Sequence, residues 1–182
     1  MESLEVYRPD VGHPDENLRV QQLLDMARGI HSRSPGSPEE VARELGHYAQ
    51  YNGGAHSIFH VVRDAESTVA LTHTSWFRES LQFNALAVSP EYRGQGMAHR
   101  LIYTLARAAI DRGIDDIWVY AMRNSHASRV YARLGMQAPP PDDERHVSHG
   151  RYYPMAASPH DVVGVSGAIE PFALVGELPR SV

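Results

Sequence analysis

A strand, a tight turn and a long helix follow one another around residues 84–98, and this succession constrains the fold more than any other part of the chain. Alternating apolar residues predict a strand over 83–88, and Pro90 ends it because proline cannot continue a paired strand. Apolar residues then recur at the spacing of one helix face from Met97 onward, and Gly113 marks the helix end. A strand that leads straight into a helix predicts a layered fold of helices on a sheet.

Gly94 and Gly96 leave backbone N–H groups bare where this helix begins, and such a helix start binds anions, most often phosphate. The segment therefore predicts a phosphate-bearing cofactor. Two common phosphate motifs are excluded. A Walker loop needs Lys and Ser/Thr after the glycine, where the chain has Met97 and Ala98. A dinucleotide fingerprint needs a further glycine at the position of His99.

Two segments together resemble the GCN5-related N-acetyltransferases, the GNAT family. The first is Arg93-x-x-Gly96-x-Ala98, which follows a strand ending in Val88-x-Pro90. The second lies about thirty residues further on and is similar to the family's Asn-x-x-Ala-x-x-x-Tyr-x-x-Leu-Gly-Phe segment, with methionine in the last place: Asn124-x-x-Ala127-x-x-x-Tyr131-x-x-Leu134-Gly135-Met136. The order and spacing of the two motifs, separated by one helix and one strand, are those of the family.

The element order along the chain indicates an α+β (mixed α/β) fold, which the resemblance sharpens to a central mixed sheet of six to seven strands flanked by about four helices. Ser37, Pro38 and Glu40 form a helix start of the capping-box type. The expected elements are strands at 4–8, 57–63, 68–76, 83–88, 115–122 and 151–156, and helices at 14–28, 37–48, 97–112 and 125–134. Residues 1–157 are expected to form the acyltransferase domain, and residues 158–182 an extension that supplies either a further strand pair or an oligomer contact.

The composition fits one globular domain and narrows the partners. The 182 residues are 42% hydrophobic and 21% charged, and the net charge of −5 argues against a general binder of nucleic acid or anionic membranes. Cysteine is absent, which excludes thiol catalysis, disulfides and thiolate metal sites. The N-terminus does not resemble a signal peptide and no apolar stretch reaches membrane-spanning length, so we expect a cytoplasmic protein.

The resemblance implies acetyl-CoA as the acyl donor and assigns roles to particular residues. Backbone amides of the fourth strand would meet the thioester oxygen and the pantetheine arm, the following loop would hold the pyrophosphate, and Asn124 would bind pantetheine. The implied cofactor-binding residues are Leu86, Ala87, Val88, Arg93, Gly94, Gln95, Gly96, Met97, Ala98 and Asn124. Tyr131 is the implied catalytic acid for the departing thiolate. Asn124 and Ser125 also form an expected helix-capping pair.

The general base is left open by the sequence. Some family members carry a glutamate five residues before the motif asparagine, where this chain has Val119. His73, Glu79 and a water held by Gln82 or Asn84 remain candidates. A metal site is not expected, because His56 and His60 would stand about 13 Å apart in a strand, and His146 and His149 have no evident third ligand.

The acceptor is expected to be a small cationic amine. In the resembling family the acceptor site uses segments that correspond here to residues 28–36, 76–81 and 139–153, which combine acids with Trp76, Phe77, Tyr152 and Tyr153. A protein- or peptide-directed acetyltransferase and a non-catalytic coenzyme A-binding module are the alternatives. The sequence also allows a homodimer.

Overall fold

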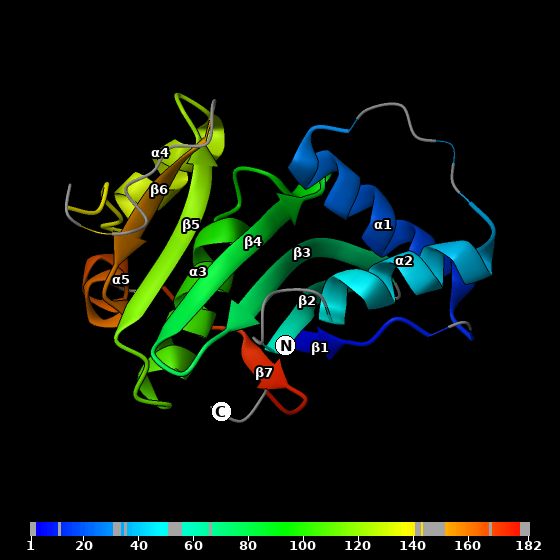
Figure 1. Cartoon of the computed structure of the whole chain (residues 1–182), viewed down its shortest axis with the longest axis horizontal. Coiled ribbons are helices and arrows are strands. Elements are labelled where there is room, and N and C mark those ends of the chain that lie inside the picture. The colour runs from blue at the N-terminus through cyan, green and yellow to red at the C-terminus, as the bar shows by residue number, and fades with distance from the viewer. Residues whose placement is uncertain are drawn as a thin grey trace.

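The computed structural model describes residues 3–10, 12–30, 34, 36–50, 56–65, 67–140, 143, 152–167 and 169–178. They form one mixed sheet covered by helices on both faces (Figure 1). Along the chain the elements are β1 (Ser3–Tyr7), α1 (Pro14–Arg28), α2 (Pro38–Gln50), β2 (His56–Asp64), β3 (Ser67–Trp76), β4 (Ser80–Val88), a 3₁₀ turn (Pro90–Tyr92), α3 (Met97–Ile110), β5 (Asp116–Met122), α4 (His126–Arg133), β6 (Tyr152–Ala157), α5 (Pro159–Ser166) and β7 (Ala173–Val175).

The predicted fold class is confirmed. The seven strands lie in the order β6-β5-β4-β3-β2-β1-β7. Strands β1 to β4 form antiparallel pairs, β4 and β5 are parallel, and β6 returns antiparallel to β5. The parallel step from β4 to β5 is the one that α3 crosses, as a strand–helix–strand crossover requires. Five α-helices surround the sheet rather than the expected four, because α5 lies in the C-terminal extension.

Local sequence signals explain where the N-terminal helices begin and end. The Ser37 hydroxyl accepts from the Glu40 N–H at 3.3 Å, and the Glu40 carboxylate accepts from the Ser37 N–H at 2.8 Å, which completes the predicted capping box. Helix α1 ends at Gly29, whose φ of 73° lets its N–H and that of Ile30 reach carbonyls in the last turn. Helix α2 continues to Gln50, two residues past its expected end.

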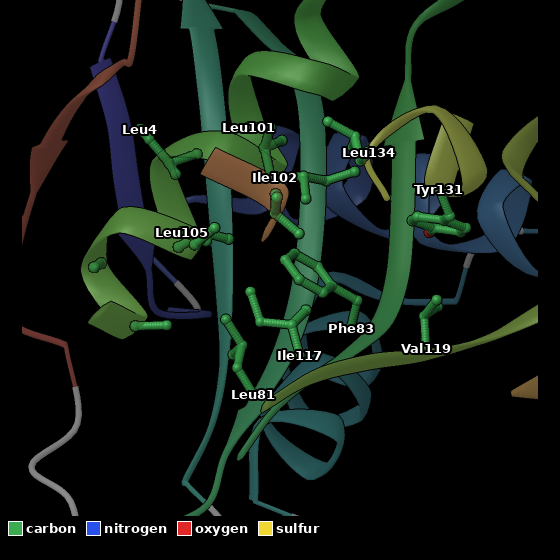
Figure 2. Close-up of a cluster of buried hydrophobic side chains, with 14 of the residues drawn as sticks. Leu4, Leu81, Phe83, Leu101, Ile102, Leu105, Ile117, Val119, Tyr131 and Leu134 are labelled. Carbon is green, nitrogen blue, oxygen red and sulfur yellow. The ribbon is translucent and has the colours of Figure 1, made fainter. Parts of the chain in front are cut away.

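Each face of the sheet has its own hydrophobic core. On one face α3, α4 and α5 cover a large cluster that includes Leu81, Phe83 and Ile117 (Figure 2). On the other face α1 and α2 cover a smaller cluster that includes Phe59 and Leu71. Helix α1 packs on β3 and β4 and helix α2 packs on β2, whereas β5 and β6 lie to one side of both helices (Figure 1).

The C-terminal extension forms a helix and a single strand instead of a strand pair. Strand β7 pairs parallel with β1, and α5 packs against α3. Phe172 is 3% exposed, its N–H donates to the Thr104 hydroxyl of α3 at 2.9 Å, and the Arg100 guanidinium lies 4.0 Å from its ring centre. The extension therefore contributes to the large core and to one edge of the sheet.

Some expectations fall on residues outside the described ranges. These are the break expected at 52–54, most of the 139–150 segment with His146 and His149, and the start of the last strand at Arg151. The rest of that strand is β6, one residue longer at its C-terminal end than expected.

Candidate active site

Strands β4 and β5 separate partway along their length. They pair in parallel from Ser80 opposite Asp116 to Phe83 opposite Val119, and the pairing stops there although both strands continue. Beyond this point β4 still pairs with β3 on its other side, and β5 with β6. The edges that β4 and β5 turn toward each other are therefore without ladder partners in their C-terminal halves, and the two strands form a splay beside Leu86, Ala87 and Val88.

A β-bulge at Asn84 stands where the two strands part. The register of β4 against β3 shifts there, from Phe83 opposite Thr74 to Ala85 opposite His73. Because of the extra residue, the side chains after the bulge point to the opposite face of the sheet from the one that strict alternation would give. Thus Phe83 packs in the large core, whereas Ala85 packs in the smaller core on the opposite face. After the bulge Leu86 and Val88 pack against the large core, and Ala87 against the smaller one.

The loop after β4 presents a run of unpaired backbone amides. The Arg93 N–H donates to the Pro90 carbonyl and the Arg100 N–H to the Gly96 carbonyl. Within the described chain, the six amides between them, at residues 94–99, have no hydrogen-bond partner. Because these N–H groups converge at the start of α3, they and the helix dipole favour an anion at this point.

The two glycines of this loop are required by its backbone shape. Gly94 and Gly96 have φ angles of 79° and 78°, in the left-handed region that L-residues rarely adopt. A Cβ atom built on either glycine would meet nothing within 4 Å. The space in front of the amides is therefore open, and a side chain placed there would extend into it.

Side chains anchor the loop without covering the amides. The Arg93 guanidinium donates to the Val88 carbonyl at 3.1 Å, and the Gln95 side chain donates to the Glu91 carbonyl at 3.2 Å. Arg19 of α1, which sequence reasoning missed, donates to the Ser89 hydroxyl at 2.6 Å and so holds the turn against the first helix. Arg19 lies in the middle of α1, and nothing in the sequence distinguishes it from an ordinary charged residue on the surface of a helix.

Positive charge gathers around the start of α3. The pKa of the His99 imidazole lies below its usual value of 6.5, first because it is partly buried and then because Arg133 and His126 are near. A lowered pKa makes the His99 ring more neutral at pH 7, so the positive charge near the bare amides comes from Arg133 and the exposed Arg93, and it favours a phosphorylated ligand.

Tyr131 projects from α4 into the large core. Only 4% of its surface is exposed, and Figure 2 shows it beside Val119 of β5, at the side of the cluster away from Leu4 and Leu105. Burial raises the pKa of the Tyr131 phenol well above its usual value of 10.0. The hydroxyl therefore keeps its proton at neutral pH, which suits a proton donor and excludes a base.

The structure corrects the expected capping role of Asn124. Ser125 alone is the N-cap of α4, because its hydroxyl accepts from the Ser128 N–H at 3.0 Å. Asn124 precedes the cap with a left-handed φ of 58°, a conformation that asparagine tolerates better than most residues. Its side chain is exposed at the end of β5, beside the splay.

The candidate bases occupy very different environments. His73 is 2% exposed beneath α1 and α2, and its ring stacks on Phe59 at 4.6 Å. Burial foremost, and then Arg28, lowers its pKa to about 4. Glu79 is exposed in the β3–β4 turn. Gln82 and Asn84 are half-buried on β4, and the Asn84 amide donates to the Ser75 hydroxyl at 2.7 Å.

The aromatic residues near the splay are not all those that sequence reasoning chose. Trp76 is 5% exposed in the large core, so it does not line an acceptor site. Trp118 and Tyr120 of β5 were expected in a buried strand, but they are only half-buried, on the face opposite the large core. Their alternation with buried Ile117, Val119 and Ala121 was the signal that could have placed them there.

In the part of the chain that the structure describes, no group of three or more His, Asp or Glu side chains is arranged to hold a metal ion. In the same residues no helix is long and apolar enough to cross a bilayer.

Comparison with known proteins agrees with the geometry of the splay and the amide loop. The model of the acetyltransferase (GNAT) family matches residues 21–136, well over half of the chain, and the protein therefore belongs to that family. Acetyl-CoA is the acyl donor of this family.

A curated relative, the thialysine N-epsilon-acetyltransferase of Bos taurus, is 30% identical over 67 residues. The match covers 36% of this chain and only 39% of that enzyme, so the relative is matched over well under half of its length.

Solved acetyltransferases share the fold. The PaiA N-acetyltransferase of Thermoplasma acidophilum, in complex with coenzyme A, has a TM-score of 0.59 and 15% identity, with 86% of this chain and 99% of that chain covered. Tetrahymena GCN5 has a TM-score of 0.64 and 12% identity, with 87% and 97% covered. A point mutant of the SpeG spermidine N-acetyltransferase of Vibrio cholerae has a TM-score of 0.60 and 20% identity, with 89% and 96% covered.

Proposed function

We propose that this protein transfers the acetyl group of acetyl-CoA to an amine of a small cationic molecule, by direct attack of the amine on the thioester. One observation carries the proposal: the parted edges of β4 and β5 lead directly to the bare amides at residues 94–99. The narrow acyl-pantetheine arm of acetyl-CoA would lie between the parted strands, and the pyrophosphate at its other end would lie on the bare amides.

The residues present fit the cofactor. The open space at Gly94 and Gly96 accepts phosphate oxygens that the amides of Gln95, Met97 and Ala98 would bind. The exposed Asn124 side chain lies at the end of β5, where it can bind the pantetheine arm. The parted edge of β4 at Leu86, Ala87 and Val88 offers backbone groups for the rest of that arm and for the acyl oxygen.

Acetyl-CoA supplies the acyl group as a reactive thioester. The chain's part is to orient it, to exclude water and to provide a proton. Tyr131 holds that proton at its hydroxyl oxygen, since burial keeps the phenol neutral. Binding the two substrates side by side at the splay supplies proximity, a large share of the rate in a two-substrate reaction.

The acceptor class is supported by the relatives. The thialysine and spermidine acetyltransferases are named for amines that carry positive charge, and both resemble this chain. His73 is too deeply buried to meet an acceptor, so a base, where one is required, acts through water near Gln82 and Asn84 or through Glu79.

The test is cofactor binding and turnover with matched glycine variants. Acetyl-CoA should raise the melting temperature of the wild type by mass action on the folded state, and a panel of amines should release free thiol from it. Gly96→Leu should abolish the acetyl-CoA shift, because the side chain would extend into the phosphate space.

Gly113→Leu is the matched control. Gly113 follows α3 at its other end, has a φ of 66° and also has open space at its Cβ, so the substitution imposes a similar backbone strain away from the site. An acetyl-CoA shift that survives in folded Gly96→Leu protein would contradict cofactor binding at this loop. Thiol release with peptides but with no small amine would instead support the protein-directed alternative, and binding without any turnover would support the non-catalytic one.

A further inference from the structure

The face of β5 that turns away from the large core carries two aromatic rings at the mouth of the splay. Trp118 and Tyr120 pack edge to face, with ring centres 5.4 Å apart and planes at 83°. Both are half-buried, whereas the alternate residues of β5 are buried on the other face. The pair thus exposes ring surface on a rigid strand rather than on a loop.

The position of the pair relative to the bulge is set by the strand register. Trp118 is opposite Gln82 of β4, and Tyr120 is the first β5 residue beyond the last pair of the parallel ladder. The bulged Asn84 lies on the same face, because its amide donates to Ser75 of β3, beneath α1 and α2. Since Asn84 uses its NH₂ group in this bond, its carbonyl oxygen is left as the group that can accept from an N–H.

The two helices that cover this face of the sheet leave β5 to one side. Helix α1 contacts β3 and β4 and helix α2 contacts β2, and Figure 1 shows β5 and β6 to one side of both helices. Tyr131, by contrast, approaches the splay from the opposite face of the sheet, within the large core. An acceptor on the Trp118 and Tyr120 face would therefore enter opposite the proposed proton donor, and the two would not compete for space.

We propose that Trp118 and Tyr120 form the binding platform for the cationic acceptor, with the Asn84 side-chain oxygen as the acceptor of one of its N–H groups. The proposal rests on the acetyl transfer proposed above and adds the residues that select its substrate. Aromatic faces attract alkylammonium groups through the negative charge of the ring face, and tryptophan does so most strongly. A cationic molecule with a second, reacting amine would be held by its charged end while the other end reaches the thioester.

A binding experiment can test the platform without turnover. The chain has two tryptophans, and Trp76 is 5% exposed in the core. Intrinsic fluorescence therefore responds to a ligand mainly through Trp118. Tetramethylammonium should change the emission of the wild type in a saturable manner, whereas tert-butanol, of similar shape but neutral, should not. The response should disappear in Trp118→Phe, which retains only the Trp76 signal.

Kinetics then assign the role of the two rings. With the best amine found, Trp118→Leu should raise the KM for the amine about tenfold. Its kcat at saturating amine and its acetyl-CoA melting shift should stay close to those of the wild type. Trp118→Phe, which keeps a ring face, should lie between the two. Tyr120→Leu provides a second variant if Trp118→Leu does not fold.

The possible outcomes distinguish a failure of the proposed cation platform from a failure of the proposed acetyl transfer. Normal turnover with an unchanged KM for the amine in both Leu variants would overturn the platform and leave the acetyltransferase intact. The absence of a saturable fluorescence response to tetramethylammonium in the wild type would also overturn it. A saturable response in a protein that acetylates no amine would uphold the cation site and overturn the proposed function instead.

Discussion

Replacing His73 with leucine should make the protein less sensitive to acid without removing its catalytic power. His73 is 2% exposed, and within the described residues its ring nitrogens make no hydrogen bond of ordinary geometry. Burial, and then the nearby Arg28 charge, lowers the pKa of its imidazole from 6.5 to about 4, although the nearby Tyr48 backbone opposes this fall. The ring is therefore neutral in the folded protein at physiological pH. Leucine of similar bulk leaves no partner unpaired, so we expect little cost at neutral pH.

The magnitude follows from proton linkage. The folded pKa is depressed, so between about pH 4 and about pH 6.5 the unfolded chain binds a proton that the folded chain rejects, and stability falls as the pH falls. Each pKa unit corresponds to about 1.4 kcal/mol. Lowering the pH from about 7.5 to about 5 should therefore remove about 2 kcal/mol through His73 alone. The buried His60, whose pKa is lowered to about 3 by burial and then by His73, should add a similar loss.

The assay is urea unfolding of wild type and His73→Leu across this pH range, with exposed His160→Gln as the matched control. Carboxylate titrations cancel in the difference between variants. The His73→Leu protein should lose about 2 kcal/mol less than the wild type, and His160→Gln should follow the wild type. Equal losses in all three proteins would refute a neutral, buried His73. A fall of about 10² or more in the turnover of His73→Leu would show instead that His73 is the general base.

Three further predictions concern the site and the C-terminal extension. Tyr131→Phe should lower turnover at saturating acetyl-CoA by about 10²–10⁴ in steady-state kinetics, and it should lower stability by only about 1 kcal/mol in urea unfolding. Near-normal turnover would show that Tyr131 has only a packing role in the core. Ser125→Ala should cost about 1 kcal/mol through the lost cap, whereas Asn124→Gly should keep the stability and raise the KM for acetyl-CoA; the reverse pattern would restore the capping role to Asn124. Phe172→Ala should cost about 3–5 kcal/mol in urea unfolding, and a loss below about 1 kcal/mol would mean that the extension is not part of the core.

The elements that the sequence predicted well are those with strong local signals. Pro14 marks the start of α1 and the left-handed Gly29 its end, the capping box marks the start of α2, and Gly96 and Gly113 bracket α3. These boundaries agree with the prediction to within about two residues. The roles of the motif residues were predicted from the resemblance to the GNAT family, and the left-handed backbone of Gly94 and Gly96 is consistent with them. The extension was harder, because β7 is only three residues long and pairs with the distant β1. The start of α5 does carry a local signal, since Ser158 caps the helix and Pro159 follows it, and the sequence reading missed this signal.

The bulge at Asn84 shows most clearly why the sequence could not predict which face of β4 each residue beside the candidate site occupies. Strict alternation along β4 would place Leu81, Phe83, Ala85 and Ala87 on one face, yet they divide between the two cores. One additional residue causes this division, and its signal is a single polar side chain whose partner, Ser75, lies on another strand. The bulge lies next to Phe83, the last β4 residue that pairs with β5. The extra residue therefore changes which face the side chains occupy at the point where the edge of β4 becomes unpaired, and the thioester is proposed to lie on that edge. Removing the Asn84 to Ser75 bond by Ser75→Ala should therefore alter the KM for the amine more than His160→Gln, a change on the exposed surface of α5. Equal effects of the two variants would show that the bulge does not position the acceptor.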